Sequence, residues 1–211
     1  MKSIERHGHW QTVYQTKGEH EVSWFQESPT ISLELIGATG VNTDASIIDI
    51  GGGASRLVDA LLDEGFSAIT VLDLSEKALE TSKARLGALN AAKVKWVAAD
   101  VTAWEPRQLY DVWHDRAAFH FLTDPKCRAA YAERVLRAVR PGGHVIIGTF
   151  ALDGPERCSG LPVVRYDSAA ISKILGPSFD LSESRTHAHK TPMGINQRFQ
   201  FSRFRRSTRV I

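Results

Sequence analysis

Three short apolar segments, each ending in glycine or in an acidic residue, constrain the fold of this chain more than any other feature. They run from Ile47 to Gly53, from Ile69 to Ser75 and from Val94 to Val101, and helix-like segments separate them. Each is rich in β-branched residues and bounded by turn residues, which is typical of a buried parallel strand. Because ligands bind at the carboxyl ends of such strands, we expect one ligand to contact all three segment ends.

The first segment ends in a glycine turn that favours an anionic or close-packed ligand. Gly51 and Gly53 let the backbone approach a ligand, because no Cβ intervenes. The N-terminus of the following helix, expected over residues 56–64, also favours an anion. Taken alone the glycines are weak evidence, since the third glycine of the dinucleotide fingerprint is missing and a plain tight turn would look the same.

The next two segment ends match the hydrogen-bonding pattern of adenosine. Asp73 is placed to accept hydrogen bonds from both hydroxyls of a ribose. Asp100 suits the exocyclic amine of adenine, and the backbone N–H of Val101 suits a ring nitrogen. The three segments together therefore predict an adenosine ligand with an anionic tail.

In this order and combination the motifs resemble those of class I S-adenosylmethionine-dependent methyltransferases. The likeness extends over residues 10–204 and includes the turn Arg140–Gly143, which resembles the one before the family's fifth strand. The resemblance implies S-adenosylmethionine as the cofactor, with the glycine turn facing its methionine end. The cofactor-binding residues it implies are Asp49, Gly51, Gly53, Asp73, Leu74, Asp100 and Val101.

A narrower likeness appears at residues 113–119, Trp-His-Asp-Arg-Ala-Ala-Phe. This segment is similar to the Asp-Arg-Gly-Ala segment of thiopurine S-methyltransferase-like proteins, and also to a segment of some protein lysine methyltransferases. The loop over residues 153–163 resembles the thiopurine group. Ala117 stands where that group usually has glycine, which leaves the methyl acceptor open.

The pattern predicts a single α/β domain over residues 1–211, with a doubly wound, seven-stranded, mostly parallel Rossmann-like sheet. Residues 1–43 are expected to form a helical lid, and residues 44–211 the sheet core. The fourth and fifth strands are expected at Asp111–His114 and His144–Phe150. Two final strands, at 179–186 and 197–204, predict an antiparallel C-terminal hairpin.

Two residues at the end of the fourth strand are candidates for catalysis. His114 could take a proton from a thiol or amine, and Asp115 could hold an acceptor amine or the ammonium group of the cofactor. In the expected lid, Tyr14 and Trp24 are candidates for an aromatic wall around the sulfonium. For each of these residues ordinary packing is the alternative.

Composition limits the class of protein. The start of the chain predicts no signal peptide, and no apolar run is long enough to span a bilayer. Two cysteines without metal-ligand spacing predict a reduced cytoplasmic setting and no metal site. Seven Lys or Arg residues and no acid follow position 184, but strand-like spacing there favours a charged edge hairpin over nucleic-acid binding.

The leading functional hypothesis is a methyltransferase that acts on a small, thiol-like heteroatom nucleophile. A protein lysine N-methyltransferase is the alternative within the same fold. An NAD(P)-dependent oxidoreductase is a remote alternative, opposed by the missing third glycine and by Asp100. A cofactor-binding protein without catalysis is a further one. The sequence predicts neither the acceptor nor the oligomeric state.

Overall fold

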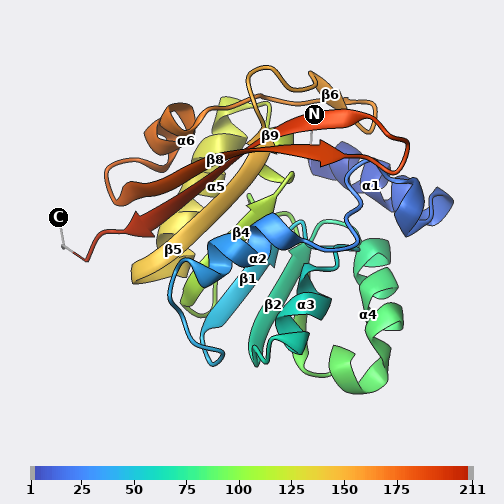
Figure 1. Cartoon of the computed structure of the whole chain (residues 1–211), viewed down its shortest axis with the longest axis horizontal. Coiled ribbons are helices and arrows are strands. Elements are labelled where there is room, and N and C mark those ends of the chain that lie inside the picture. The colour runs from blue at the N-terminus through green and yellow to red at the C-terminus, as the bar shows by residue number, and fades with distance from the viewer. Residues whose placement is uncertain (1–2, 209–211) are drawn as a thin grey trace.

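The computed structural model describes residues 3–208 and contains a seven-stranded sheet in the order β3-β2-β1-β4-β5-β9-β8 (Figure 1). The helical elements are α1 (Ser3–Thr16), η1 (Glu19–Glu21), α2 (Thr30–Gly37), α3 (Leu57–Asp63), α4 (Glu76–Ala91), η2 (Phe119–Phe121), α5 (Pro125–Ala138) and α6 (Ser168–Leu175). The strands are β1 (Ser46–Ile50), β2 (Ala68–Asp73), β3 (Val94–Ala98), β4 (Tyr110–Arg116), β5 (Val139–Phe150), β6 (Arg157–Cys158), β7 (Leu161–Pro162), β8 (Phe179–Lys190) and β9 (Asn196–Arg206).

Strands β1 to β5 are parallel, and the β8–β9 hairpin closes the sheet with antiparallel pairing. The predicted fold class is therefore confirmed. Beyond the sheet, the two short strands β6 and β7 pair with each other.

The sheet is buried on both faces because neighbouring strand residues point to opposite sides. Ile48 and Ile147 belong to the core packed against α5 and α6, whereas Ile47 and Ile146 belong to the core packed against α2 and α3. In Figure 1, α2 and α3 cross in front of the sheet and α5 lies behind it. This two-sided coverage explains why the strands are continuous apolar runs in the sequence.

Several strands are longer than the sequence predicts. β4 continues to Arg116, two residues beyond the expected end. β5 begins at Val139 and includes the turn expected at Arg140–Gly143, because Val139 already pairs with Tyr110 across a register shift. In the hairpin, β8 ends at Lys190 and β9 begins at Asn196, because the two strands stay paired up to the tip. The extra length of β4 has the largest consequence for the ligand site, because the strand end at the ligand-binding edge of the sheet is Arg116 and not His114.

The N-terminal region divides into two parts with different positions. α1 packs against α4, where the side-chain oxygen of Gln11 accepts a hydrogen bond from the backbone N–H of Lys77 at 3.1 Å. α2 instead packs on the face of the sheet, with Leu35 and Ile36 buried in the core. α2, which the sequence analysis assigned to a lid over residues 1–43, is therefore part of the core.

Candidate active site

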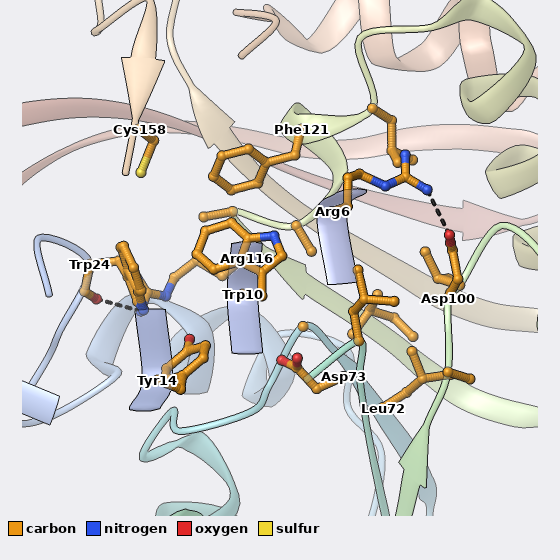
Figure 2. A pocket seen from close by; sticks show the side chains of 18 residues that line it. Arg6, Trp10, Tyr14, Trp24, Leu72, Asp73, Asp100, Arg116, Phe121 and Cys158 are labelled. Carbon is orange, nitrogen blue, oxygen red and sulfur yellow. Dashed lines mark hydrogen bonds and ion pairs between the residues drawn. The ribbon is translucent and has the colours of Figure 1, made fainter. Parts of the chain in front are cut away.

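A cavity lies at the carboxyl ends of the central strands, beneath α1 and the segment that follows it (Figure 2). At one end, its wall is formed by residues from the ends of β2 and β3: Leu72, Asp73, Leu74, Ala99, Asp100 and Val101. At the other end lie mostly aromatic and larger side chains: Trp10, Tyr14, Trp24, Arg116, Phe121 and Cys158. Seven of the residues predicted from sequence thus meet in one cavity: Gly51, Asp73, Leu74, Asp100, Val101, Tyr14 and Trp24.

The glycine turn after β1 is shaped by close packing rather than by exposure. Gly51 lines the cavity with a φ of +67°, and a Cβ there would come 2.6 Å from the Cβ of Ala118. Gly53 is buried behind the wall, and a Cβ there would come 2.5 Å from Oδ2 of Asp73. Gly51 therefore allows the close approach of Ala118 at the cavity wall, whereas Gly53 leaves space for the carboxylate that faces it.

Asp73 lies at the end of β2 and is held by backbone amides. Its Oδ1 accepts a hydrogen bond from the N–H of Ser75 at 2.7 Å. Burial raises the pKa of Asp73 to about 7, and the charge of Asp49 acts in the same direction, while the amides of Ser75, Gly53 and Leu74 oppose it. The carboxylate is thus fixed in place and poorly compensated, which suits an acceptor of ligand hydroxyl hydrogen bonds.

Asp49 supports this turn from below and does not line the cavity. It is 3% exposed, and its Oδ1 lies 2.7 Å from Nδ1 of His114. A Cβ on Gly52 would overlap the other carboxylate oxygen of Asp49. The resemblance predicts that Asp49 contacts the cofactor directly. In the structure its side chain instead packs under the glycine turn, outside the cavity wall.

Asp100 lies at the far end of the cavity and is bound to the N-terminal helix. Its Oδ2 is 2.6 Å from Nη2 of Arg6, and its Oδ1 accepts hydrogen bonds from the backbone and side chain of Thr102. These contacts hold the carboxylate of Asp100 at the end of the cavity. The pair joins α1 to the end of β3 across the mouth of the cavity.

Residues of α1 and the following segment form an aromatic cluster over the other end. The ring centroid of Trp10 lies 5.5 Å from that of Trp24 and 4.9 Å from that of Phe121, with both pairs close to perpendicular. The ring centroids of Tyr14 and Trp24 lie 6.2 Å apart in an edge-to-face arrangement. Aromatic faces attract a cation, so this cluster is suited to a sulfonium.

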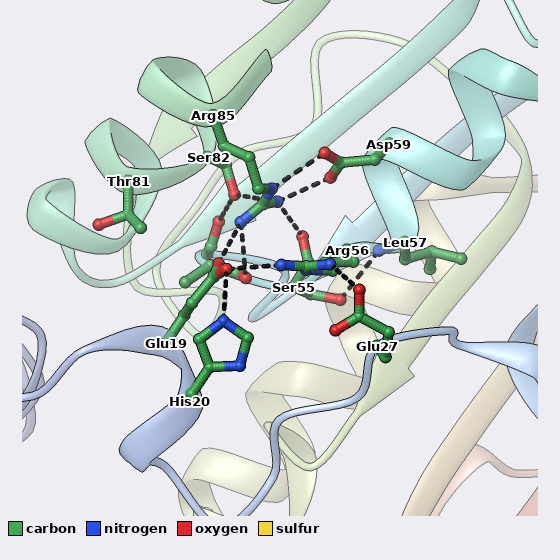
Figure 3. Close-up of polar contacts among 12 residues, drawn as sticks. Glu19, His20, Glu27, Ser55, Arg56, Leu57, Asp59, Thr81, Ser82 and Arg85 are labelled. Carbon is green, nitrogen blue, oxygen red and sulfur yellow. Dashed lines mark hydrogen bonds and ion pairs between the residues drawn. The ribbon is translucent and has the colours of Figure 1, made fainter.

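An ion-pair network fixes the segment after α1 (Figure 3). Glu19 contacts Arg56 at 2.7 Å and Arg85 at 3.0 Å, and Arg85 in turn makes two hydrogen bonds with Asp59 at 2.9 and 2.7 Å. These side chains come from η1, α4, α3 and the residue before α3, so they anchor the aromatic cluster to the sheet core. Networks of several charges contribute more to such anchoring than isolated surface pairs do.

The two predicted catalytic residues are not among the described residues that line the cavity. Because β4 continues to Arg116, they lie within the strand and their side chains point to opposite faces of the sheet. His114 is 2% exposed, and its Nε2 lies 2.9 Å from Oγ of Ser32 on α2. Asp115 is fully buried and accepts hydrogen bonds from the Tyr131 hydroxyl at 2.8 Å and from the amides of Ala118 and Phe119. Both predicted residues therefore lie outside the cavity wall in this structure, and their contacts are made within the sheet and its helices.

The cavity also contains residues outside the predicted set of cofactor-binding and catalytic residues. Arg6, Trp10 and Tyr14 follow one another at intervals of four, which places them on one face of α1, so Arg6 could have been found from helical periodicity. Arg116 and Phe121 carry no such signal. Cys158 reaches the cavity from β6, and burial raises the pKa of its thiol to about 11, which keeps it neutral near pH 7.

Comparisons with known proteins agree with this geometry. A family model described as a methyltransferase domain matches residues 47–143. "Probable thiol methyltransferase 2" of Arabidopsis thaliana is 33% identical over 155 residues, which cover 73% of this chain and 66% of the relative, just under two thirds of its length. "Thiocyanate methyltransferase 1" of the same organism is 24% identical over 83% of this chain and 74% of the relative.

Solved structures show the same fold. The 1,6-didemethyltoxoflavin-N1-methyltransferase of Burkholderia thailandensis, solved with S-adenosylhomocysteine, superposes with a TM-score of 0.70 at 20% identity, over 97% of this chain and 85% of that one. The N-methyltransferase NodS of Bradyrhizobium japonicum, in complex with S-adenosylhomocysteine, has a TM-score of 0.70 at 15% identity, over 94% and 98% of the chains.

This chain belongs to the class I S-adenosylmethionine-dependent methyltransferases, as the sequence motifs predicted. The cofactor of this family fits the cavity: acceptors for a ribose and an adenine amine lie at one end, and aromatic rings for a sulfonium at the other. In the described part of the chain, no helix is long and apolar enough to cross a membrane. The same residues contain no cluster of three or more His, Cys, Asp or Glu side chains that could hold a metal ion.

Proposed function

We propose that the protein transfers the methyl group of S-adenosylmethionine to a small, thiol-like nucleophile. The observation that carries this proposal is the composition of the acceptor end of the cavity, which combines the aromatic cluster with the guanidinium of Arg116. Such a site is partly enclosed, lined mostly by aromatic side chains and positively charged, which suits a compact nucleophile that ionises easily. The similarity to a thiol methyltransferase supports the same class of acceptor.

The residues present can account for the reaction without a strong base. Asp73 would hold the ribose, Asp100 and the N–H of Val101 the adenine, and the backbone at Gly51 the methionine portion. In the transfer, the acceptor sulfur forms a bond to the methyl carbon, the bond from that carbon to the sulfonium breaks, and the thiol proton leaves to solvent. The protein contributes by aligning the two partners and excluding water, which lowers the barrier to an in-line displacement.

The alternative of a protein lysine acceptor has less support in this cavity. A lysine needs a carboxylate to receive its ammonium group, and the carboxylates on the described wall, Asp73 and Asp100, lie toward the nucleoside end. At the acceptor end an ammonium group would meet Arg116 instead. An anionic acceptor is attracted by that guanidinium, whereas an ammonium group gains no such attraction.

A comparison of acceptors tests the proposal. Purified protein with S-adenosylmethionine is incubated separately with a small aliphatic thiol, thiocyanate, a primary amine of similar size and a lysine-containing peptide, and released S-adenosylhomocysteine is measured. We expect turnover with thiol or thiocyanate to exceed that with either amine by at least roughly tenfold. Methylation of the peptide without methylation of any small acceptor would overturn the proposal.

A further inference from the structure

Arg116 occupies an unusual electrostatic position in this cavity. Its backbone pairs with Gly148 at the end of β4, and its Nη2 donates a hydrogen bond to the backbone carbonyl of Trp24 at 2.8 Å (Figure 2). Within residues 3–208, no carboxylate oxygen lies within ion-pairing distance, 4.0 Å, of this guanidinium. The cation is therefore held in the cavity wall by a neutral partner.

Three other arginines with mostly buried side chains face carboxylates instead. Arg6, Arg85 and Arg203 lie 2.6, 2.7 and 3.1 Å from the carboxylates of Asp100, Asp59 and Glu183. Burial lowers the pKa of Arg116, and the more distant charge of Asp49 offsets this only in part. Because an enclosed charge without a counter-ion is costly, a site that retains one is suited to a ligand that supplies the opposite charge.

The order of the strands indicates where that opposite charge would come from. Along the edge of the sheet the strand ends follow the order β3, β2, β1, β4, which carry Asp100, Asp73, Gly51 and Arg116. A ligand with its adenine at Asp100 and its ribose at Asp73 extends past Gly51 toward Arg116. The part of the ligand, or the co-substrate, that reaches this end meets the guanidinium.

We infer that Arg116 forms an anion-binding subsite in the cavity, which receives a carboxylate or an ionised nucleophile. The anion is either the α-carboxylate of the cofactor or the acceptor itself in its ionised form. A guanidinium suits both, since its planar fork can bind a carboxylate through two hydrogen bonds and its charge stabilises a thiolate. The inference rests on the proposed placement of the cofactor, but not on the identity of the acceptor.

Binding measurements with Arg116→Met and Arg116→Lys distinguish the two sources. Calorimetry is performed with S-adenosylhomocysteine and with its decarboxylated analogue, which lacks only the carboxylate. Sodium thiocyanate is then titrated into the S-adenosylhomocysteine complex as a probe anion. Arg203→Met is the matched control, because it removes an arginine that is paired with Glu183 in the hairpin, away from the cavity.

If Arg116 binds the cofactor carboxylate, Arg116→Met weakens S-adenosylhomocysteine by roughly tenfold or more and leaves the decarboxylated analogue unchanged. If it binds the acceptor, both nucleosides bind as in the wild type, and thiocyanate affinity falls by a similar factor. Arg116→Lys keeps the positive charge, so we expect it to lose less affinity than Arg116→Met. If the Met variant does not fold, the Lys variant is measured in its place. Unchanged binding of all three ligands, or an equal loss of all three, would overturn the inference. These outcomes need no turnover, so they stay separate from the acceptor test.

Discussion

Replacement of Asp73 by alanine is expected to weaken the binding of S-adenosylhomocysteine by about 2–3 kcal/mol, or roughly 30- to 150-fold in Kd. Asp73 is 7% exposed and lines the cavity, where its carboxylate would accept the ribose hydroxyls. Asp63→Ala is the control, since it removes an exposed acid at the end of α3. Calorimetry measures both variants, and wild-type affinity in a folded Asp73→Ala protein would place the ribose elsewhere.

The pH dependence of ligand affinity is a second test of the role of Asp73. Because the pKa of Asp73 is raised to about 7, part of the carboxyl is protonated in the unliganded protein near neutral pH. Hydrogen bonds from the ribose favour the charged form, so S-adenosylhomocysteine should bind more tightly as the pH rises from 6 to 8. In the unliganded protein the same shift lowers the free energy of unfolding as pH rises from about 4 to 7, since the unfolded carboxyl ionises first.

The second large effect is expected at Asp115, and it concerns stability. Asp115→Ala leaves the amides of Ala118 and Phe119 and the hydroxyl of Tyr131 without their acceptor in a fully buried site. We expect a loss of about 2–5 kcal/mol in the free energy of unfolding, and a melting temperature lower by roughly 5–15 °C. Thermal unfolding followed by circular dichroism measures this change.

Tyr131→Phe is the matched variant for this experiment, because it removes the hydroxyl that Asp115 accepts from and retains the ring. Its expected cost is about 1–2 kcal/mol, since the hydroxyl also accepts a hydrogen bond from Trp113. If Asp115→Ala instead keeps wild-type stability and loses turnover with amine acceptors alone, Asp115 acts on the acceptor, as the sequence had predicted.

The position of Asp115 also explains a departure from the family pattern. Ala117 has a φ of +66°, a left-handed conformation that favours glycine and costs other residues about 1–2 kcal/mol. This accounts for the glycine that the thiopurine group usually has here. The turn is retained by the hydrogen bond from the N–H of Ala117 to the carbonyl of Gly148 and by the Asp115 carboxylate. These hydrogen bonds hold Ala117 in the left-handed conformation.

The cofactor end of the cavity could be predicted from the sequence because it depends on local features. Asp73 is the last residue of β2, and Asp100 lies two residues after the end of β3. Parallel strands bring such ends together at one edge of the sheet. The acceptor end depends on features that are not local. The aromatic contact of Trp10 with Phe121 and the ion pair of Arg6 with Asp100 join residues far apart in sequence, through the docking of α1.

The catalytic prediction and the structure differ in where they place His114 and Asp115, for a geometric reason. It assumed that β4 ends at His114, whereas pairing with β5 continues to Arg116. A difference of two residues moved His114 and Asp115 from the edge of the sheet into its two cores, and brought Arg116 to the edge. The residue at which a strand ends depends on its pairing with neighbouring strands, so it cannot be predicted from the apolar pattern of the strand alone.

The central claim is that this cavity binds the nucleoside portion of S-adenosylmethionine, and calorimetry of the wild-type protein tests it most directly. S-adenosylhomocysteine and NAD are titrated separately under the same conditions. The account predicts one saturable site for S-adenosylhomocysteine, and for NAD either no measurable heat or an affinity weaker by roughly a hundredfold. Tight binding of NAD without any response to S-adenosylhomocysteine would contradict it.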